Sequence, residues 1–301
     1  MKCDFLDVAD LSADELEAVL ALSAAPIERL GAPLASRGVA LIFEKPSNRT
    51  RQSMEMAVVQ LGGHPVYTRG EEVGFDVREP VEDIARIMSG YHSVLAARVF
   101  SHSVVERLAA SAPVSVVNLL SDRSHPMQAL ADMLTMQQAL GDMRGRTIAY
   151  VGDFNNVARS LCEISVRLGV HVRLGCPAGY DAQPDELERL DRLGEGTVEQ
   201  VIDPIDAVTG ACVVHTDSWT SMGQEHEQQS RNEVFGRYQV TSQLMSAADG
   251  EAMFMHCLPA HRGFEVSAEV IDGSASLVVA QGHNRMHTSR GLLAFVLGVR
   301  P

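Results

Sequence analysis

The chain has few cysteines, and their spacing matches neither a disulfide framework nor a metal site. Its 301 residues contain five cysteines, an odd number, scattered without a C-x-x-C pair. This usage argues against a disulfide-stabilised secreted domain and favours a reducing compartment. No second Cys/His pair accompanies His256-Cys257 at the spacing of zinc ligands. We therefore expect no metal and no zinc chemistry.

Basic residues and long apolar segments are also scarce. Lys and Arg together number 25 against 39 Asp and Glu, a formal net charge of −14, which disfavours bulk binding to nucleic acid or acidic membranes. Any anion site must then be a local basic island. No apolar stretch is long enough to cross a bilayer, and the segment from Met1 to Phe5 does not start a signal-peptide pattern. We expect a cytoplasmic protein with no nucleic-acid or membrane partner.

Two nucleotide-binding patterns are absent as well. The chain has neither G-x-x-x-x-G-K-[ST] nor G-x-G-x-x-G, so neither a P-loop nor a dinucleotide site is supported. We expect no cofactor. What the chain does contain is 46% hydrophobic residues and enough length for two domains of ordinary size.

Short apolar runs typical of buried strands alternate with segments of helical periodicity. The expected strands are 39–43, 65–68, 94–100, 114–119, 147–152, 170–174, 211–215, 253–255 and 277–280. The expected helices are one from the Ser12/Glu15 capping box toward Leu30, one beginning near Arg49, and 81–91, 104–110, 127–140, 157–168, 185–193 and 287–297. This alternation predicts parallel sheets covered by helices on both faces.

The pattern restarts after the helix 127–140, which places a domain boundary there. We predict an α/β fold of two tandem parallel-sheet domains, 1–135 and 136–286, with the C-terminal helix of about 287–301 joining the first. Two such units in tandem favour a ligand cleft between them.

The segment most suggestive of chemistry is Glu44-Lys45-Pro46-Ser47-Asn48-Arg49-Thr50-Arg51, which follows the strand 39–43. Hydroxyls, backbone N–H groups and two arginines gather there at a helix N-terminus, where an anion is favoured. Guanidinium groups also match phosphate oxygens. The segment predicts a phosphate site, although Ser47 as a simple cap with solvated arginines is an equal alternative on this segment alone.

Two further segments of the first half carry polar groups at the ends of expected elements. Arg98 ends an apolar strand, where it faces the usual ligand crevice of a parallel sheet or forms a surface ion pair. In His125-Pro126-Met127-Gln128, Pro126 fits the first turn of a helix. His125 is there able to donate to a carbonyl or phosphate oxygen, or only to cap the helix.

The second half offers three such segments. Asp153-Phe154-Asn155-Asn156 occupies a strand-to-helix turn, where the amides bind a carboxylate or merely shape the turn. Asp217, after an apolar strand and with Ser221 four residues on, is suited to an ammonium group. Neighbours in a strand alternate sides, so His256-Cys257 is not expected to act as a protease dyad.

Taken in order, these segments resemble the ornithine carbamoyltransferase family over essentially the whole chain. The motifs that carry the resemblance are Ser47-Asn48-Arg49-Thr50-Arg51, Arg98, His125-Pro126-Met127-Gln128, Asp153-Phe154-Asn155-Asn156, Asp217 with Ser221-Met222-Gly223, His256-Cys257-Leu258-Pro259 and Asn284-Arg285. The resemblance implies carbamoyl transfer from carbamoyl phosphate to the side-chain amine of L-ornithine, without a cofactor, by a homotrimer in arginine metabolism.

The resemblance also implies a role for each matching residue. The phosphate would be bound by Ser47, Asn48, Arg49 and Thr50, and the carbamoyl end by Arg98, His125 and Gln128. The amino-acid groups of ornithine would be bound by Asn156, Asp217, Ser221 and Met222, and its δ-amine positioned by Cys257 and Leu258. Arg285 would contact the carbamoyl oxygen. The residues expected to act in catalysis are Arg98, His125, Cys257 and Arg285, and the segment around 221–223 is expected to close over the site.

The sequence departs from the family pattern at four places: Asn48, Phe154, His283 and Glu72. Glu72 matters most, because relatives place glutamine or histidine there, in a loop that reaches the phosphate site of a neighbouring subunit. A carboxylate facing phosphate is repulsive unless an arginine such as Arg69 or Arg78 intervenes. This leaves open a carbamoyltransferase for another amine (putrescine, lysine or aspartate) and a catalytically silent ligand-binding paralogue. A Rossmann oxidoreductase is disfavoured by the missing glycine pattern.

Overall fold

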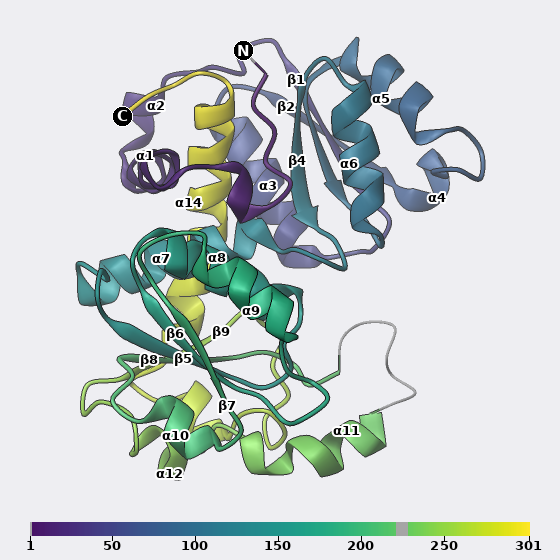
Figure 1. The fold of residues 1–301 in the computed structure, drawn as a ribbon. Coiled ribbons are helices and arrows are strands. Elements are labelled where there is room, and N and C mark those ends of the chain that lie inside the picture. Colours follow the sequence, from purple (N-terminus) through teal and green to yellow (C-terminus); the bar gives the residue numbers. More distant parts are fainter. Residues whose placement is uncertain (1, 221–227) are drawn as a thin grey trace. The chain divides into compact units, whose positions relative to one another are not determined.

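The computed structural model describes residues 2–220 and 228–301, and the chain divides into two compact units (Figure 1). Unit 1 consists of Met1–Leu134 and His283–Pro301, and unit 2 of Thr135–Gly282. The division falls inside two helices, α7 (Pro126–Leu140) and α14 (Val278–Val296). Within the described ranges, no helix combines the length and the apolar character needed to cross a bilayer.

Unit 1 is built on a four-stranded parallel sheet in the order β2-β1-β3-β4. Its strands are β1 (Gly38–Phe43), β2 (His64–Arg69), β3 (His92–Arg98) and β4 (Ser115–Leu120). In Figure 1, α5 (Val81–Ser89) and α6 (His102–Ser111) lie on one side of this sheet and α3 (Asn48–Gln60) and α14 on the other. Residues 39–43 and 94–98 of the central strands are all buried, as expected for a parallel sheet covered on both faces.

Unit 2 is built on a five-stranded parallel sheet in the order β7-β6-β5-β8-β9. Its strands are β5 (Thr147–Val151), β6 (His171–Gly175), β7 (Val198–Val201), β8 (Val213–Thr216) and β9 (Met253–His256). Its helices within the described residues, apart from the parts of α7 and α14 that it shares, are α8 (Asn156–Arg167), α9 (Pro184–Asp191), α10 (Pro204–Val208), α11 (Gln228–Phe235), η3 (Gly236–Tyr238), α12 (Ser242–Met245) and α13 (Ala268–Ile271). The fold class predicted from the sequence, two parallel-sheet α/β domains, is confirmed.

The order of strands reverses once in each sheet. In unit 1 the chain adds β2 on one side of β1 and then β3 and β4 on the other, and in unit 2 it adds β6 and β7 on one side of β5 and then β8 and β9 on the other. Ligands of open parallel sheets bind beyond the carboxyl ends of the strands at such a reversal. The carboxyl ends of β1 and β3, and those of β5 and β8, are therefore the places to look for functional groups.

Three sequence-based assignments of secondary structure need correction. The predicted strand 277–280 is wrong, because Val278 begins α14, and a short apolar run by itself does not distinguish a strand from a buried helix end. The predicted first helix stops early, since α1 spans Ala13–Ala24 and Pro26 precedes a separate short helix α2 (Ile27–Leu30). Strand β7 was not predicted, because its residues 199–201 are only partly buried or exposed and lack a strong apolar pattern.

The end of α14 that belongs to unit 1 packs very closely against α1. A Cβ atom added at Gly291 would lie 2.6 Å from the backbone nitrogen of Ser23, so glycine is needed for this approach. Arg290, the preceding residue, donates to the carbonyl oxygens of Ser23 and Ala25 at 3.4 and 3.2 Å. These contacts anchor the C-terminal helix to unit 1, together with its buried residues Leu292 to Val296.

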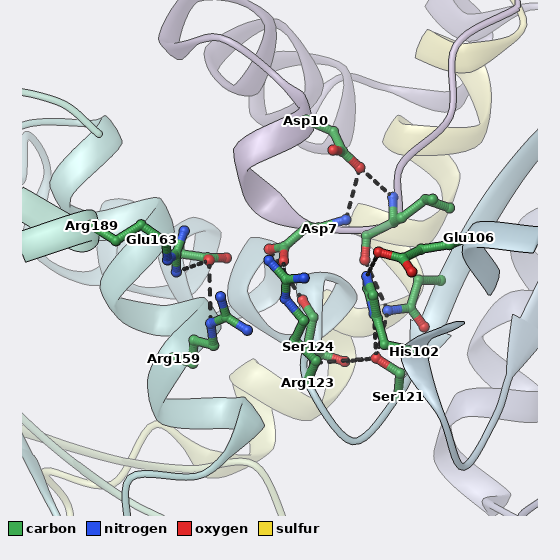
Figure 2. Close-up of polar contacts among 12 residues, drawn as sticks. Asp7, Asp10, His102, Glu106, Ser121, Arg123, Ser124, Arg159, Glu163 and Arg189 are labelled. Carbon is green, nitrogen blue, oxygen red and sulfur yellow. Dashed lines mark hydrogen bonds and ion pairs between the residues drawn. The ribbon is translucent and has the colours of Figure 1, made fainter. Parts of the chain in front are cut away.

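Within unit 2 a buried carboxylate ties α8 to α9 (Figure 2). Glu163 on α8 is fully buried, and its Oε1 accepts from Arg189 Nη2 at 2.5 Å and lies 3.7 Å from Arg159 Nε. Both arginines also bond Glu186 of α9 at 2.7 Å.

The remaining short elements of unit 1 within the described residues are η1 (Val8–Asp10) and α4 (Gly70–Val73).

Candidate active site

The predicted phosphate segment lies at the carboxyl end of β1, where α3 begins. Ser47 is the N-cap of α3, but its side chain makes no capping bond to the backbone and instead donates to Thr50 Oγ1 at 3.0 Å. Arg49 is half-buried, and among the described residues its guanidinium has no hydrogen-bond or ion-pair partner. The first turn of α3 thus keeps its N–H groups and one guanidinium available to an anion.

The second arginine of the segment has a different role from the first. Arg51 Nε donates to Glu55 Oε1 at 2.8 Å, and its guanidinium carbon lies 3.7 Å from the centre of the Tyr67 ring. The side chain is 45% exposed. The sequence grouped both arginines, whereas within residues 2–220 and 228–301 only Arg49 of the two has a guanidinium without another partner.

Arg285 of α14 joins three segments of unit 1 that lie far apart in the sequence. Its Nη1 donates to Gln128 Oε1 at 2.6 Å and its Nη2 to Thr50 Oγ1 at 2.8 Å, and Nη1 is 3.5 Å from His125 Nε2. Arg285 is buried, as are Thr50, Gln128 and His125. The Thr50 oxygen accepts from both Ser47 and Arg285, so its own O–H proton is left to donate to a third group such as a ligand oxygen. This cluster can bind an oxyanion and a carbonyl oxygen.

Arg98 and His125 complete the positive surroundings of this cluster. Arg98 ends β3 and pairs in register with Phe43, the last residue of β1, so it lies at the strand reversal. It is only 4% exposed, which rules out the alternative of a surface ion pair. Burial holds the pKa of His125 well below its usual value, and the charges of Arg285 and Arg98 lower it further. His125 is therefore a neutral imidazole, with one nitrogen to donate and one to accept.

The turn that delivers His125 to the start of α7 is held by a polar network that the sequence did not indicate (Figure 2). Ser121 Oγ lies 2.8 Å from His102 Nδ1 and accepts from the backbone N–H of Ser124 at 3.2 Å. Ser124 Oγ in turn donates to Asp7 Oδ1 at 3.3 Å. Burial, followed by the charge of Arg123, lowers the pKa of His102. The network fixes the turn from inside unit 1.

In unit 2, Asp217 lies directly beyond the carboxyl end of β8, beside the end of β5. Its Oδ1 accepts from Cys257 Sγ at 2.9 Å and from the backbone N–H of Ser218 at 2.8 Å. Its Oδ2 accepts from Asn155 Nδ2 at 2.9 Å. Half-buried and held on both oxygens, the carboxylate is positioned to bind a cationic or amine group.

The contact of Asn155 with Asp217 was not predicted from the sequence. Asn155 also caps α8, since its Oδ1 accepts from the N–H groups of Val157 and Ala158 at 2.9 and 3.1 Å. An asparagine one residue before a helix is a recognisable N-cap signal, and it could have identified this residue. Asn156 is the first residue of α8. Ser221 and Met222, and with them the expected closing segment, lie outside the described residues.

The turn after β9 positions Cys257 and Leu258. Leu258 adopts a left-handed conformation with φ of 58°, its N–H donates to His256 Nδ1 at 2.9 Å, and the Leu258–Pro259 peptide bond is cis. His256 Nε2 lies 3.3 Å from Glu265 Oε1, whereas the Cys257 thiol bonds Asp217. The two neighbours thus bond different carboxylates, as expected for residues that do not form a dyad.

Among the described residues, Asp217, His256 and Cys257 are the group that could offer metal ligands. One potential ligand atom from each lies within 4.8 Å of the others. Both nitrogens of His256 already face protein partners, Leu258 N–H and Glu265, so a metal would have to displace one of them. The geometry fits hydrogen bonding to an organic ligand better than a metal.

Glu72, the most serious departure from the family pattern, is engaged within its own chain. Its Oε2 accepts from the backbone N–H of Arg69 at 2.8 Å, which caps α4. Arg78 Nη1 donates to the carbonyl oxygen of Glu72 at 2.9 Å, and this links the loop to α4. The Glu72 carboxylate has a structural partner here.

The fold and the two clusters define a two-unit α/β protein with polar groups at each strand reversal, an oxyanion-binding set in unit 1 and a carboxylate–thiol pair in unit 2. Comparison with known families agrees with this description. The model described as "Aspartate/ornithine carbamoyltransferase, carbamoyl-P binding domain" matches residues 3–138, and that described as "Aspartate/ornithine carbamoyltransferase, Asp/Orn binding domain" matches residues 144–296. The chain belongs to the aspartate/ornithine carbamoyltransferase family.

Individual relatives are similar over nearly the whole chain. The ornithine carbamoyltransferase of Parasynechococcus marenigrum (strain WH8102) is 45% identical over 300 residues, which cover 98% of this chain and 94% of that protein. Among solved structures, the ornithine carbamoyltransferase from Pyrococcus furiosus is 39% identical with a TM-score of 0.92, covering 99% of this chain and 98% of that one. That from Thermus thermophilus is 40% identical with a TM-score of 0.88, covering 99% of both chains.

Proposed function

We propose that this chain transfers the carbamoyl group of carbamoyl phosphate to the δ-amine of L-ornithine, giving citrulline and phosphate. The observation that carries the proposal is the meeting of Thr50, Gln128 and His125 at the guanidinium of Arg285. These residues come from three of the segments that carry the family resemblance. The family match and the relatives named ornithine carbamoyltransferase support the same activity.

In unit 1 the proposed ligand is carbamoyl phosphate. The first turn of α3 binds the phosphate through its backbone N–H groups, the Arg49 guanidinium and the hydroxyl proton of Thr50. The carbamoyl oxygen faces Arg285 and His125, with Arg98 adding positive charge, and the carbamoyl amino group faces Gln128. The full phosphate set is Ser47, Asn48, Arg49 and Thr50, and the carbamoyl set is Arg98, His125, Gln128 and Arg285.

In unit 2 the proposed ligand is L-ornithine. Asp217, held by Asn155, binds one of its amine groups, and Cys257 and the backbone at Leu258 position the δ-amine. Asn156, Ser221 and Met222 complete the proposed amino-acid set. Because a free alkyl amine titrates near the lysine value of about 10.4, the site must favour the neutral form before attack. The carboxylate–thiol pair supplies acceptors for an N–H group in that form.

The proposed reaction balances without a dedicated general base. The lone pair of the neutral δ-amine attacks the carbonyl carbon, a new C–N bond forms, and negative charge develops on the carbonyl oxygen. Arg285, His125 and Arg98 stabilise that charge with preorganised donors. The C–O bond to phosphate then breaks, and the departing phosphate takes the proton that the nitrogen loses. Holding both substrates in one complex supplies much of the rate.

The assembly and the compartment are part of the proposal. We propose a homotrimer, since the resemblance places the loop containing Glu72 at a neighbouring subunit's site, and light scattering after gel filtration measures the mass directly. We place the enzyme in the cytoplasm, a compartment that agrees with cysteines that form no disulfide among the described residues.

The test is an assay of citrulline and phosphate release with the purified chain. L-Ornithine should give equal amounts of both products, while lysine, putrescine and aspartate should give little. Arg49→Ala should raise the KM for carbamoyl phosphate, and Arg51→Ala is its matched control because Arg51 lies two residues on and bonds Glu55 instead. Asp217→Asn should mainly raise the KM for ornithine. Failure of ornithine to yield citrulline would overturn the proposal, as would equal loss of both substrates in Asp217→Asn.

A further inference from the structure

Asp132 is a buried carboxylate that the proposed chemistry does not use. It lies on α7 four residues after Gln128, on the same face of the helix, and is 0% exposed. Its Oδ1 accepts a hydrogen bond from Gln128 Nε2 at 2.8 Å. A carboxylate at full burial is costly unless it is hydrogen-bonded, so its position beside Gln128 calls for a reason.

The two ends of the Gln128 amide face partners of opposite kind. Nε2 faces the Asp132 carboxylate, which accepts, and Oε1 faces Arg285 Nη1, which can only donate, at 2.6 Å. Turning the amide over would place the oxygen against the carboxylate and the NH₂ group against the guanidinium. Both contacts would then be repulsive. Asp132 and Arg285 therefore select one amide orientation.

In that orientation the Gln128 amide turns its oxygen, an acceptor, toward Arg285 and the proposed ligand site. A carbonyl oxygen has two lone pairs, and Arg285 occupies one of those on Gln128 Oε1. The other is able to accept from an N–H group of a ligand. A methyl group of the same size offers no N–H, and a buried acceptor left unpaired has a desolvation cost.

We propose that Asp132 is a positioning residue that holds Gln128 as a hydrogen-bond acceptor and so selects an amino group over a methyl group in the acyl phosphate. The inference rests on the proposed function, in that it places carbamoyl phosphate at this cluster. Acetyl phosphate is the matched probe, because it carries methyl where carbamoyl phosphate carries NH₂. Sites built to hydrogen-bond an NH group discriminate strongly against analogues that lack it.

The experiment measures the dissociation constants of carbamoyl phosphate and acetyl phosphate by calorimetry, for the full chain and its variants. Asp132→Leu removes the acceptor at similar volume and should weaken carbamoyl phosphate binding about 5- to 150-fold, with acetyl phosphate changed by about twofold at most. Asp132→Asn keeps one oxygen and should fall between wild type and Asp132→Leu. The quantity compared is the dissociation constant of acetyl phosphate divided by that of carbamoyl phosphate. This ratio is independent of how much of each preparation is folded.

Two controls separate positioning from a merely structural role. Gln128→Ala should lower the same ratio, and adding Asp132→Leu to it should lower the ratio no further, since both act through one amide. Ser289→Ala removes a buried hydroxyl that bonds the Arg285 carbonyl oxygen at 2.7 Å and should leave the ratio unchanged.

The outcomes distinguish this inference from the proposed function. A ratio that falls in Gln128→Ala but not in Asp132→Leu overturns the role of Asp132, and a ratio that falls in neither variant overturns the acceptor role of Gln128. A chain that binds the two acyl phosphates as expected yet makes no citrulline from ornithine refutes only the proposed reaction.

Discussion

Replacing Arg285 with methionine separates catalysis from folding in this chain. Methionine fills a similar length without charge, and it removes the donors to Gln128 Oε1 at 2.6 Å and Thr50 Oγ1 at 2.8 Å. Hydrogen bonds to charged groups contribute about 1.5–3 kcal/mol each. Gln128 and Thr50 carry no charge, so at these two contacts the substitution leaves no uncompensated buried charge, which is the case in which removing one partner is most destabilising. We therefore expect a folded Arg285→Met variant.

The catalytic loss should be far larger than the stability change. Removal of a single oxyanion donor costs about 10²- to 10³-fold in kcat, and Arg285 in addition orients Gln128 and Thr50. We expect kcat/KM for carbamoyl phosphate to fall about 10³-fold, which corresponds to about 4 kcal/mol of transition-state stabilisation. Arg285→Lys keeps the charge but has one ammonium group in place of a two-armed fork, so it should recover only part of this loss.

The assay is initial-rate citrulline formation over a range of carbamoyl phosphate at saturating ornithine, with urea unfolding of each variant alongside. The reasoning is refuted if folded Arg285→Met keeps more than about a tenth of the wild-type kcat/KM, or if Arg285→Lys equals the wild type. Either result would mean that the negative charge of the transition state does not develop at the Arg285 guanidinium.

Two further predictions concern stability. Arg231 is buried and donates to Asp153 Oδ2 at 2.8 Å and to the Trp219 carbonyl oxygen at 2.9 Å. Arg231→Met removes the guanidinium that pairs with the Asp153 carboxylate and should lower the free energy of unfolding by about 3–5 kcal/mol in urea titrations; a loss below about 1 kcal/mol would contradict it. Acid should destabilise the chain through His125, whose pKa in the folded state lies well below its usual value. Above pH of about 6.5 neither the folded nor the unfolded chain binds a proton at His125, whereas below that pH only the unfolded chain does. The free energy of unfolding therefore falls as pH falls, by at most about 1.4 kcal/mol per pH unit for this residue. Unfolding measured from pH 7.5 to 5.5 should show a shallower loss in His125→Gln, and an unchanged slope would exclude this histidine as a cause.

Much of the secondary structure was predictable from the chain alone because its signals are local. The Ser12/Glu15 capping box forms as expected, with Ser12 Oγ accepting from the Glu15 N–H. The buried strand 39–43 and the helix beginning near Arg49 correspond to β1 and α3. The predicted strand 277–280 was wrong because four apolar residues are too few to show a helical or a strand period. Only their continuation into α14 decides their conformation.

Side-chain partners were much less predictable. Nothing in the spacing of the sequence separates Arg49 from Arg51, yet one has no protein partner among the described residues and the other bonds Glu55 and stacks on Tyr67. The choice depends on the aromatic ring and the carboxylate that the fold places beside α3. The contact of Asn155 with Asp217 was not predicted because it spans 62 residues of sequence.

By itself the sequence determined the class of fold and most of the strands and helices, because hydrophobic periodicity, caps and turn residues act over a few positions. It also predicted which short segments carry chemistry. Only the tertiary structure decided that Arg285 reaches Thr50, Gln128 and His125, that Asp217 holds the Cys257 thiol, and that Asp132 sets the Gln128 amide. Strand reversal in each parallel sheet brings distant chain segments to one edge, and the direction of each hydrogen bond there depends on which donor and which acceptor the packing brings within reach.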